Sequence, residues 1–276
     1  MKKIILPVDF SKHSEYALET AATLAKKHNA QLIVMNMLEL SESIFSESSS
    51  DKQEEMLFML ASANKTFESF LDKDYLEGID VVPMIKRHKV FKEVDIIAKQ
   101  EDADLIVMGS RGHSNHDGIF TGSNTEKVVR HSDTPVLVVK GKHTNVDFDN
   151  VVLATDFSEE SIPAFKKASN LLNTLGNKIT LLHINTPHNG FRSTDEIETK
   201  ANEFLKKADA KDWKDHIKYA SDYSVEDGVL NHSKRTGAQL LAMTTHGKTG
   251  LSHFFGGSIA EDVVNHSMLP VITFKL

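Results

Sequence analysis

The segment Ile5–Ser11 reads Ile-Leu-Pro-Val-Asp-Phe-Ser and returns 147 residues later as Val152–Ser158, Val-Leu-Ala-Thr-Asp-Phe-Ser. Each copy is a short apolar run that ends in Asp-Phe-Ser, which is typical of a buried strand followed by the start of a helix. Three residues further along also return at this spacing: Ser14, Ala17 and Ala21 recur as Ser161, Ala164 and Ala168. A repeat of this length predicts two similar domains in one chain.

A second repeat lies near the end of each half. Ten residues between Gly112 and Val136 recur 135 residues later, between Gly247 and Val271. The spacing shortens because the first half has extra residues, and we expect most of them in Ser41–Glu55, a serine-rich, acidic stretch that predicts a mobile loop. The polar run Gly141–Asp149 predicts a linker. We therefore expect domains at residues 1–141 and 149–276.

Each half alternates short apolar runs with amphipathic segments, the pattern of an α/β fold with a parallel sheet covered on both faces. Apolar residues between Ser14 and His28 have helical spacing, and a similar stripe begins at Val90. The expected strands of the first half are Lys3–Val8, Gln31–Met37, Ile79–Met84, Asp104–Met108 and Pro135–Val139. Those of the second half are Asn150–Thr155, Lys178–Ile184, His216–Ala220, Gln239–Met243 and Pro270–Phe274.

Composition excludes several classes of function. The chain has 276 residues, a formal net charge of −7 and no cysteine, so disulfides and thiolate chemistry are absent. Lys and Arg form no strong cluster, which argues against a nucleic-acid partner. The apolar run after Lys3 ends at Asp9, too short for a signal peptide, and no run approaches the length of a membrane-spanning helix. We expect a cytoplasmic protein without a membrane partner.

The segment Gly109–Ser123 is the strongest candidate for a ligand site. It has glycines at 109, 112 and 122, it follows an expected strand, and Ser123 opens an expected helix. Glycine lets the backbone approach a ligand closely. Backbone N–H groups at a helix N-terminus attract phosphate oxygens, helped by the helix dipole. Strand, glycine loop and helix together therefore predict a phosphate-binding loop.

The spacing Gly-x₂-Gly-x₉-Gly-Ser resembles the nucleotide signature of ATP-binding universal stress proteins. Leu6–Ser11 and Glu126–Val139 also look like that family, and the resemblance covers nearly the whole chain, twice. It implies a tandem protein with two Rossmann-like, adenine nucleotide alpha-hydrolase-like domains. Each domain would have a five-stranded parallel sheet in the order 3-2-1-4-5. That order would place the first and fourth strands side by side, so that Asp9 and Gly109 would open onto one crevice.

The resemblance also implies a ligand, ATP or AMP, with Mg²⁺ as a companion of a bound triphosphate. Asp9, with Pro7 beside it, would contact the adenosine, and backbone groups at Met37 would recognise adenine. The ribose and phosphates would be held by Gly109, Ser110, Arg111, Gly112, His113, Ser114, Gly122, Ser123, Asn124 and Thr125.

The second half departs from this pattern at one position, where Thr244 replaces Gly109. A β-branched residue is a poor substitute if the site needs positive φ or close backbone approach. We therefore expect a second, weaker site, formed by Asp156, Ile184, Thr244, Gly247, Gly257 and Ser258. The sequence Gly247-Lys248-Thr249 is not a Walker A motif, because Ala242 stands where that motif needs glycine.

Structural interpretations stand beside the functional ones. Ser123 with Glu126, and Ser258 with Glu261, also fit capping boxes. Asp9 could be a turn residue, and Ser11 the cap of the first helix. The cluster Met56–Leu60, with Phe67 and Phe70, reads as the buried face of a helix. The 14 histidines show no metal-binding motif, so no metal site is expected.

Three functions remain open. The first is an adenine-nucleotide-binding stress-response protein that acts as a sensor or regulator. The second is a ligand-free pairing module, and the third an adenylating or ATP-hydrolysing enzyme. No convincing nucleophile or general base stands near the glycine loop, so any hydrolysis should be slow and no catalytic residue is assigned. The two halves should pair through Pro135–Lys140 and Pro270–Lys275, edge-strand candidates, which leaves a homodimer and a protein partner open.

Overall fold

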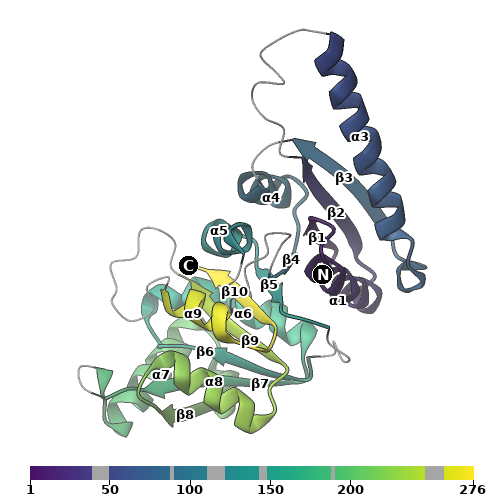
Figure 1. Ribbon diagram of the computed structural model, residues 1–276. Helices are drawn as coiled ribbons and strands as arrows, with labels where there is room; N and C mark the ends of the chain where they lie inside the picture. Colours follow the sequence, from purple (N-terminus) through teal and green to yellow (C-terminus); the bar gives the residue numbers. More distant parts are fainter. Residues whose placement is uncertain (39–49, 88–89, 111–121, 143–147, 188–189, 246–257) are drawn as a thin grey trace.

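The computed structural model describes residues 1–38, 50–87, 90–110, 122–142, 148–187, 190–245 and 258–276. In the first half, strands and helices alternate as the sequence predicts (Figure 1). The elements are β1 (Lys3–Val8), α1 (Lys12–His28), β2 (Gln31–Leu38), α3 (Ser50–Leu71), β3 (Val81–Arg87), α4 (Val90–Gln100), β4 (Leu105–Gly109), α5 (Ser123–His131) and β5 (Val136–Val139).

The second half repeats this order. Its elements are β6 (Asn150–Ala154), a 3₁₀ turn (Glu159–Ser161), α6 (Ile162–Leu175), β7 (Lys178–Asn185), α7 (Thr194–Ala208), a 3₁₀ segment (Lys211–His216), β8 (Ile217–Ser221), α8 (Val225–Thr236), β9 (Leu240–Thr245), α9 (Ser258–His266) and β10 (Val271–Lys275). The largest error of the sequence analysis concerns β3, which begins two residues later and ends three residues later than expected.

The strands of the described chain form one ten-stranded sheet, in the order β3-β2-β1-β4-β5-β10-β9-β6-β7-β8. Each half therefore has the order 3-2-1-4-5. Strands β1 and β4 are neighbours, with Ile5 opposite Ile106, as the resemblance implied. All pairs are parallel except β5 with β10, which join the two halves antiparallel. The predicted pairing of these two edge strands is confirmed.

Helices cover both faces of the sheet, which explains the continuous apolar runs of the strands. One buried cluster contains side chains of α1, α6 and α7, and the other contains side chains of α4, α5, α8 and α9. Both clusters include residues of both halves, so each core crosses the junction. Ile4, Ile5 and Leu6 are fully buried, and each such side chain contributes about 1.5–3 kcal/mol to stability. No helix in the described part of the chain is long and apolar enough to span a bilayer.

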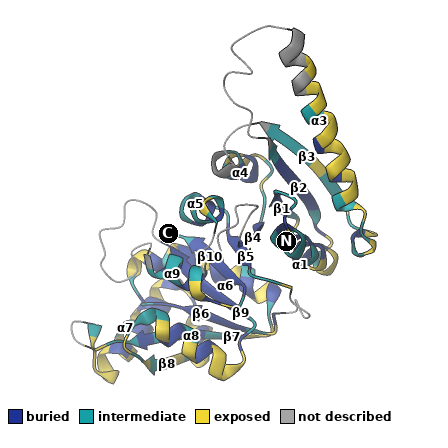
Figure 2. Ribbon diagram, in the orientation of Figure 1, coloured by how far each residue is buried: buried dark blue, intermediate teal, exposed yellow. Residues whose placement is uncertain are grey.

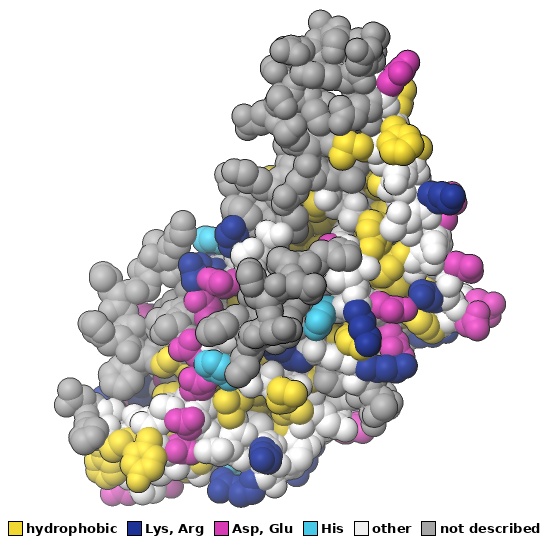
Figure 3. All heavy atoms as spheres, in the orientation of Figure 1, with side chains coloured by type: hydrophobic (Ala, Val, Ile, Leu, Met, Phe, Trp, Pro, Cys, Tyr) yellow, Lys and Arg dark blue, Asp and Glu magenta, His cyan; other side chains and the backbone are white. Residues whose placement is uncertain are grey.

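Helix α3 corrects two expectations. It begins at Ser50, so the last residues of the expected loop Ser41–Glu55 are helical. Phe67 is buried, but Leu57 is 63% exposed and Phe58 is 75% exposed. Figure 2 shows the outer side of α3 exposed, and in Figure 3 hydrophobic side chains lie uncovered along this helix. The interpretation of Met56–Leu60 as a buried face was wrong at these two positions, because this part of α3 does not pack on the sheet.

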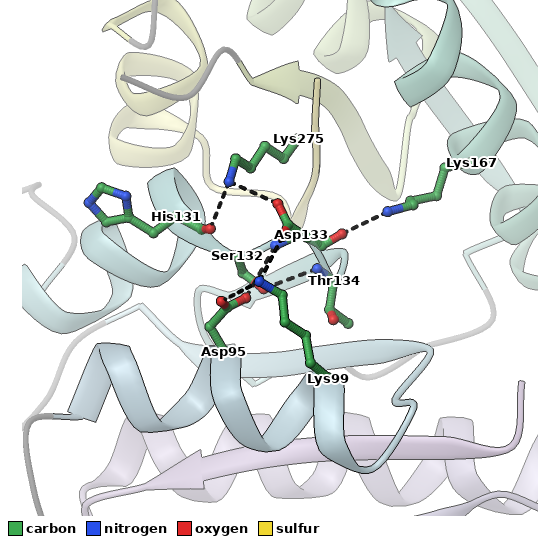
Figure 4. A network of polar contacts seen from close by, with 8 residues as sticks. All are labelled: Asp95, Lys99, His131, Ser132, Asp133, Thr134, Lys167 and Lys275. Carbon is green, nitrogen blue, oxygen red and sulfur yellow. Dashed lines mark hydrogen bonds and ion pairs between the residues drawn. The ribbon is translucent and has the colours of Figure 1, made fainter. Parts of the chain in front are cut away.

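Asp133 joins the two halves beside the β5–β10 pair (Figure 4). Its carboxylate accepts hydrogen bonds from Lys275 of β10 at 2.8 Å and pairs with Lys99 of α4 at 2.7 Å. Its backbone carbonyl accepts a bond from Lys167 of α6. The hydrogen bonds from Lys275 and Lys99 lower the pKa of Asp133 to about 2. This side chain is half exposed, so its ion pairs add little stability.

A second contact joins helices α5 and α9. The Arg130 guanidinium binds both carboxylate oxygens of Glu261, each at 2.7 Å, and also reaches Glu126 at 3.1 Å. Glu126 and Glu261 lie in the first turns of α5 and α9. A two-point arginine–carboxylate pair fixes geometry as well as energy. The helices that follow the two glycine-rich segments are therefore connected to each other.

Candidate functional site

The carboxyl ends of β2, β1 and β4 meet at one edge of the sheet. Asp9 follows β1 directly, Met37 is the last residue but one of β2, and Gly109 ends β4. Pro7 lies in β1, opposite Met35. The strand order thus brings together four residues that the sequence analysis assigned to one site. This edge is where parallel α/β sheets bind ligands.

Asp9 has a structural task at this edge. Its carboxylate accepts hydrogen bonds from the Ser14 hydroxyl at 2.7 Å and from the Ser11 amide at 3.1 Å. Ser11 is the N-cap of α1, and its side chain accepts a bond from the Ser14 amide, as the sequence predicts. Asp9 is therefore held in one orientation beside the start of α1. This turn role and a role in ligand contact are compatible.

Phe10 adopts φ of +62°, and Phe157, its counterpart in the second half, adopts +54°. A bulky residue in this left-handed region is strained. Phe10 is kept there by edge-to-face packing against Phe67 and Phe70 of α3, at 5.3 Å between ring centroids in both pairs. The same strained turn in both halves fixes the aspartate that precedes it.

Gly109 is required by packing against the protein itself. A Cβ atom placed there would lie 2.7 Å from the backbone carbon and oxygen of His13, at the start of α1. Its φ is not in the left-handed region. In the second half, a 3₁₀ turn precedes α6, which begins only at Ile162, and Thr244 occupies the position of Gly109 in β9. The different start of this helix accounts for the threonine.

The N-terminus of α5 faces the same edge. Gly122 is its N-cap, and its amide donates to the Ser110 carbonyl at 2.7 Å. The Thr125 hydroxyl donates to the Gly109 carbonyl at 2.9 Å, which fixes the first turn of the helix to the end of β4. No side chain caps α5, so the capping box proposed for Ser123 is wrong: Ser123 lies inside the helix, one residue after the cap.

The structure thus places Pro7, Asp9, Met37, Gly109, Ser110, Gly122, Ser123, Asn124 and Thr125 on β1, β2, β4, the start of α5 and the turns beside them. Four further residues of this predicted site lie outside the described residues: Arg111, Gly112, His113 and Ser114. In the second half, Gly247 and Gly257 also lie outside them, as does the side chain of Ser258.

The second half has a cavity of about 290 Å³ at the carboxyl ends of β6 and β7. Asp156 and Ile184, both assigned to the second site, line it together with His183, Arg192 and Lys200. Thr244 is not among its lining residues. Two of the predicted residues are therefore brought together around a real cavity.

The universal stress protein family matches this chain twice, over residues 1–140 and 147–275. The chain belongs to the universal stress protein family. A universal stress protein of Methanocaldococcus jannaschii is 32% identical over 166 residues, which cover 52% of this chain and 97% of that protein. A putative universal stress protein of Staphylococcus saprophyticus is 31% identical, covering 58% of this chain and 95% of that one.

A solved structure with the same tandem arrangement is a universal stress protein from Archaeoglobus fulgidus. It aligns with a TM-score of 0.63 and 24% identity, over 99% of this chain and 98% of that chain. At this identity the likeness concerns the fold. This protein is thus a tandem member of the family.

Two polar residues of this universal stress protein escaped the sequence analysis. Asn36 in β2 is buried and donates to the Val8 carbonyl at 2.9 Å. His183, its counterpart 147 residues later, contacts the Thr155 carbonyl at 3.1 Å. Each side chain joins the end of one central strand to its neighbour. Aligning the two halves at the known spacing would have revealed the pair.

Among the described residues, no group of three or more His, Asp or Glu side chains could hold a metal ion. Mg²⁺ could enter only with phosphate groups, as hard cations bound to nucleotides commonly do. The backbone amides at the start of α5 are suited to anions and the Asp9 carboxylate to hydrogen-bond donors. This arrangement binds and orients a ligand.

Proposed function

We propose that this universal stress protein binds an adenine nucleotide, ATP or AMP, mainly in its first half, and acts as a sensor or regulator. The observation that supports this most is the first turn of α5. Its N-terminus has no side-chain cap, and two hydrogen bonds hold it to the end of β4. Amides of a helix N-terminus that lack a side-chain acceptor attract phosphate oxygens.

In the proposed complex, adenine lies against the backbone at Met37 and the adenosine contacts Asp9. The phosphates lie at the start of α5, near Ser123, Asn124 and Thr125. The Asp9 carboxylate needs no reorganisation, because Ser11 and Ser14 already hold it. The residues fit the ligand: amides and the helix dipole favour negative charge, and Mg²⁺ would coordinate phosphates and water.

A regulatory role suits this site better than catalysis. The proposal assigns no nucleophile and no general base, because Asp9 holds the turn before α1. Bound nucleotide would instead order the start of α5, which contacts α9 through Arg130 and Glu261. The nucleotide could therefore be communicated to the second half.

Isothermal titration of purified protein with ATP, ADP and AMP tests the proposal. We expect Gly112→Val to abolish most nucleotide binding, because the side chain would obstruct the phosphate loop, and the matched change Gly247→Val to matter less. Equal losses at the two positions would refute the preference for the first half. Absence of nucleotide binding by the unmodified chain would favour the pairing module, which the β5–β10 pairing alone also supports.

A further inference from the structure

The cavity of the second half differs in its chemistry from the site proposed in the first. It lies between the ends of β6 and β7, α7 and the start of α8, with Asp156, Ser158, His183, Arg192 and Lys200 among its lining residues. Its volume of about 290 Å³ is at the small end of ligand pockets, which range from roughly 300 to 1,000 Å³. It suits a nucleoside better than a nucleoside with a long phosphate chain.

His183 offers this cavity a hydrogen-bond acceptor. Its Nδ1 lies 3.1 Å from the Thr155 carbonyl, which can only accept, so Nδ1 bears the proton. Burial lowers the pKa of His183; the carbonyl of Thr155 and Asp156 oppose this, and Lys200 and Arg192 reinforce it. The ring is therefore neutral, and it stacks on Phe157 with centroids 5.4 Å apart. Nε2 is then the ring atom left to accept a bond from a ligand.

Ser158 offers a second polar atom. Its hydroxyl is buried and has no hydrogen-bond partner among the described residues. Its counterpart in the first half, Ser11, has one, because it caps α1 and bonds to Ser14. In the second half Ser161, the counterpart of Ser14, instead donates to the Ser158 carbonyl. A buried hydroxyl without a partner is costly, and a ligand in this cavity would relieve that cost.

Charge limits what the cavity accepts. Its lining includes three carboxylates, Asp156, Glu159 and Glu160, against the two cations Arg192 and Lys200. Lys200 donates to the Asp156 carbonyl oxygen at 2.8 Å. The Arg192 backbone is clamped by Asn185 through two hydrogen bonds, at 2.9 and 3.1 Å, which places Arg192 at the cavity. A single anionic group can meet Arg192, whereas a triphosphate would meet net negative charge.

We infer that the second half holds a separate site for a nucleoside with at most one phosphate, read by His183 and Ser158, which rejects a nucleoside triphosphate. The inference rests on the proposed function, since it assumes that adenine nucleotides are the ligands of this chain. The two halves then hold different ligands, a triphosphate in the first and a nucleoside or its monophosphate in the second. The chain would thereby compare the two.

Calorimetric titration of the Gly112→Val protein with adenosine, AMP and ATP tests the inference, because this change silences the first site. We expect one site for adenosine or AMP and at least about tenfold weaker ATP binding. His183→Asn installs the residue found in the first half and keeps a donor for Thr155. It should weaken binding about tenfold, the value of one lost hydrogen bond. Arg192→Gln should weaken AMP binding and leave adenosine binding unchanged.

Ser158→Ala separates recognition from folding. Because this hydroxyl has no partner in the protein, its removal should leave the urea midpoint unchanged or raised, while nucleoside binding weakens several-fold. The control Ser11→Ala should lower the midpoint, because it removes the cap of α1. Absence of adenosine and AMP binding in the Gly112→Val protein, or ATP binding as tight as AMP binding, would overturn the inference. So would binding that is indifferent to His183→Asn and Ser158→Ala. ATP binding by the unmodified protein would in each case keep the proposed function intact.

Discussion

Gly109→Ala should destabilise the ligand-free protein, because this glycine is needed where β4 approaches α1. The added Cβ would lie 2.7 Å from two backbone atoms of His13 and 3.1 Å from its Cβ. Backbone atoms cannot rotate away as a flexible side chain can, so β4 and α1 must separate. Forcing an extra carbon into a packed interior costs about 1–3 kcal/mol. Removing a glycine also restricts the unfolded chain, which offsets about 0.4–1 kcal/mol of this.

The net loss is about 1–2 kcal/mol, which equilibrium unfolding in urea resolves. With a slope of about 2–3 kcal/mol per molar urea, the midpoint should fall by about 0.5–1 M. Gly141→Ala is the matched control, because a Cβ there would meet nothing within 4 Å. Its midpoint should stay within about 0.2 M of the unmodified protein. Equal midpoints for the two variants would refute the packing argument and leave Gly109 with a ligand-binding role alone.

Three further predictions concern the seam and α3. The pKa of Asp133 is lowered to about 2, so its stabilisation is present above pH about 4 and lost as the pH falls towards 2. Asp133→Asn should therefore cost up to about 1 kcal/mol at pH 6 and nothing at pH 2; urea midpoints with an unchanged gap at both pH values would contradict this. A double-mutant cycle of Arg130→Ala and Glu261→Ala should give a coupling of about 1 kcal/mol that shrinks in high salt, whereas additive effects would exclude a working ion pair. Phe67→Ala should cost about 3–5 kcal/mol and Phe58→Ala less than about 0.5 kcal/mol in thermal or urea unfolding, and similar losses at both positions would mean that Phe58 is covered in solution.

The sequence predicted most of the fold because its repeat and its apolar runs are local patterns. The strand Lys3–Val8 was predicted at its true bounds, since it is apolar and ends at the turn residue Asp9. The strand β3 was misplaced, because Val81–Arg87 contains a proline and charged residues. As a strand at the end of the sheet, β3 pairs on one side only, and that environment tolerates such residues.

The site was predicted less completely, because its geometry depends on contacts between distant segments. Nothing local shows that Gly109 must admit the His13 backbone. Nor does the spacing of Ser123 and Glu126 reveal that the helix takes Gly122 as its cap. The orphaned Ser158 hydroxyl follows from a helix that begins one turn late, which only the folded chain shows.

A crystal structure of the chain with saturating ATP and Mg²⁺ tests the central claim most directly. The account predicts adenine beside Met37 and the phosphates at the start of α5, within reach of the Ser123 and Thr125 amides. Nucleotide bound elsewhere, or an empty edge at the ends of β1 and β4, would contradict it.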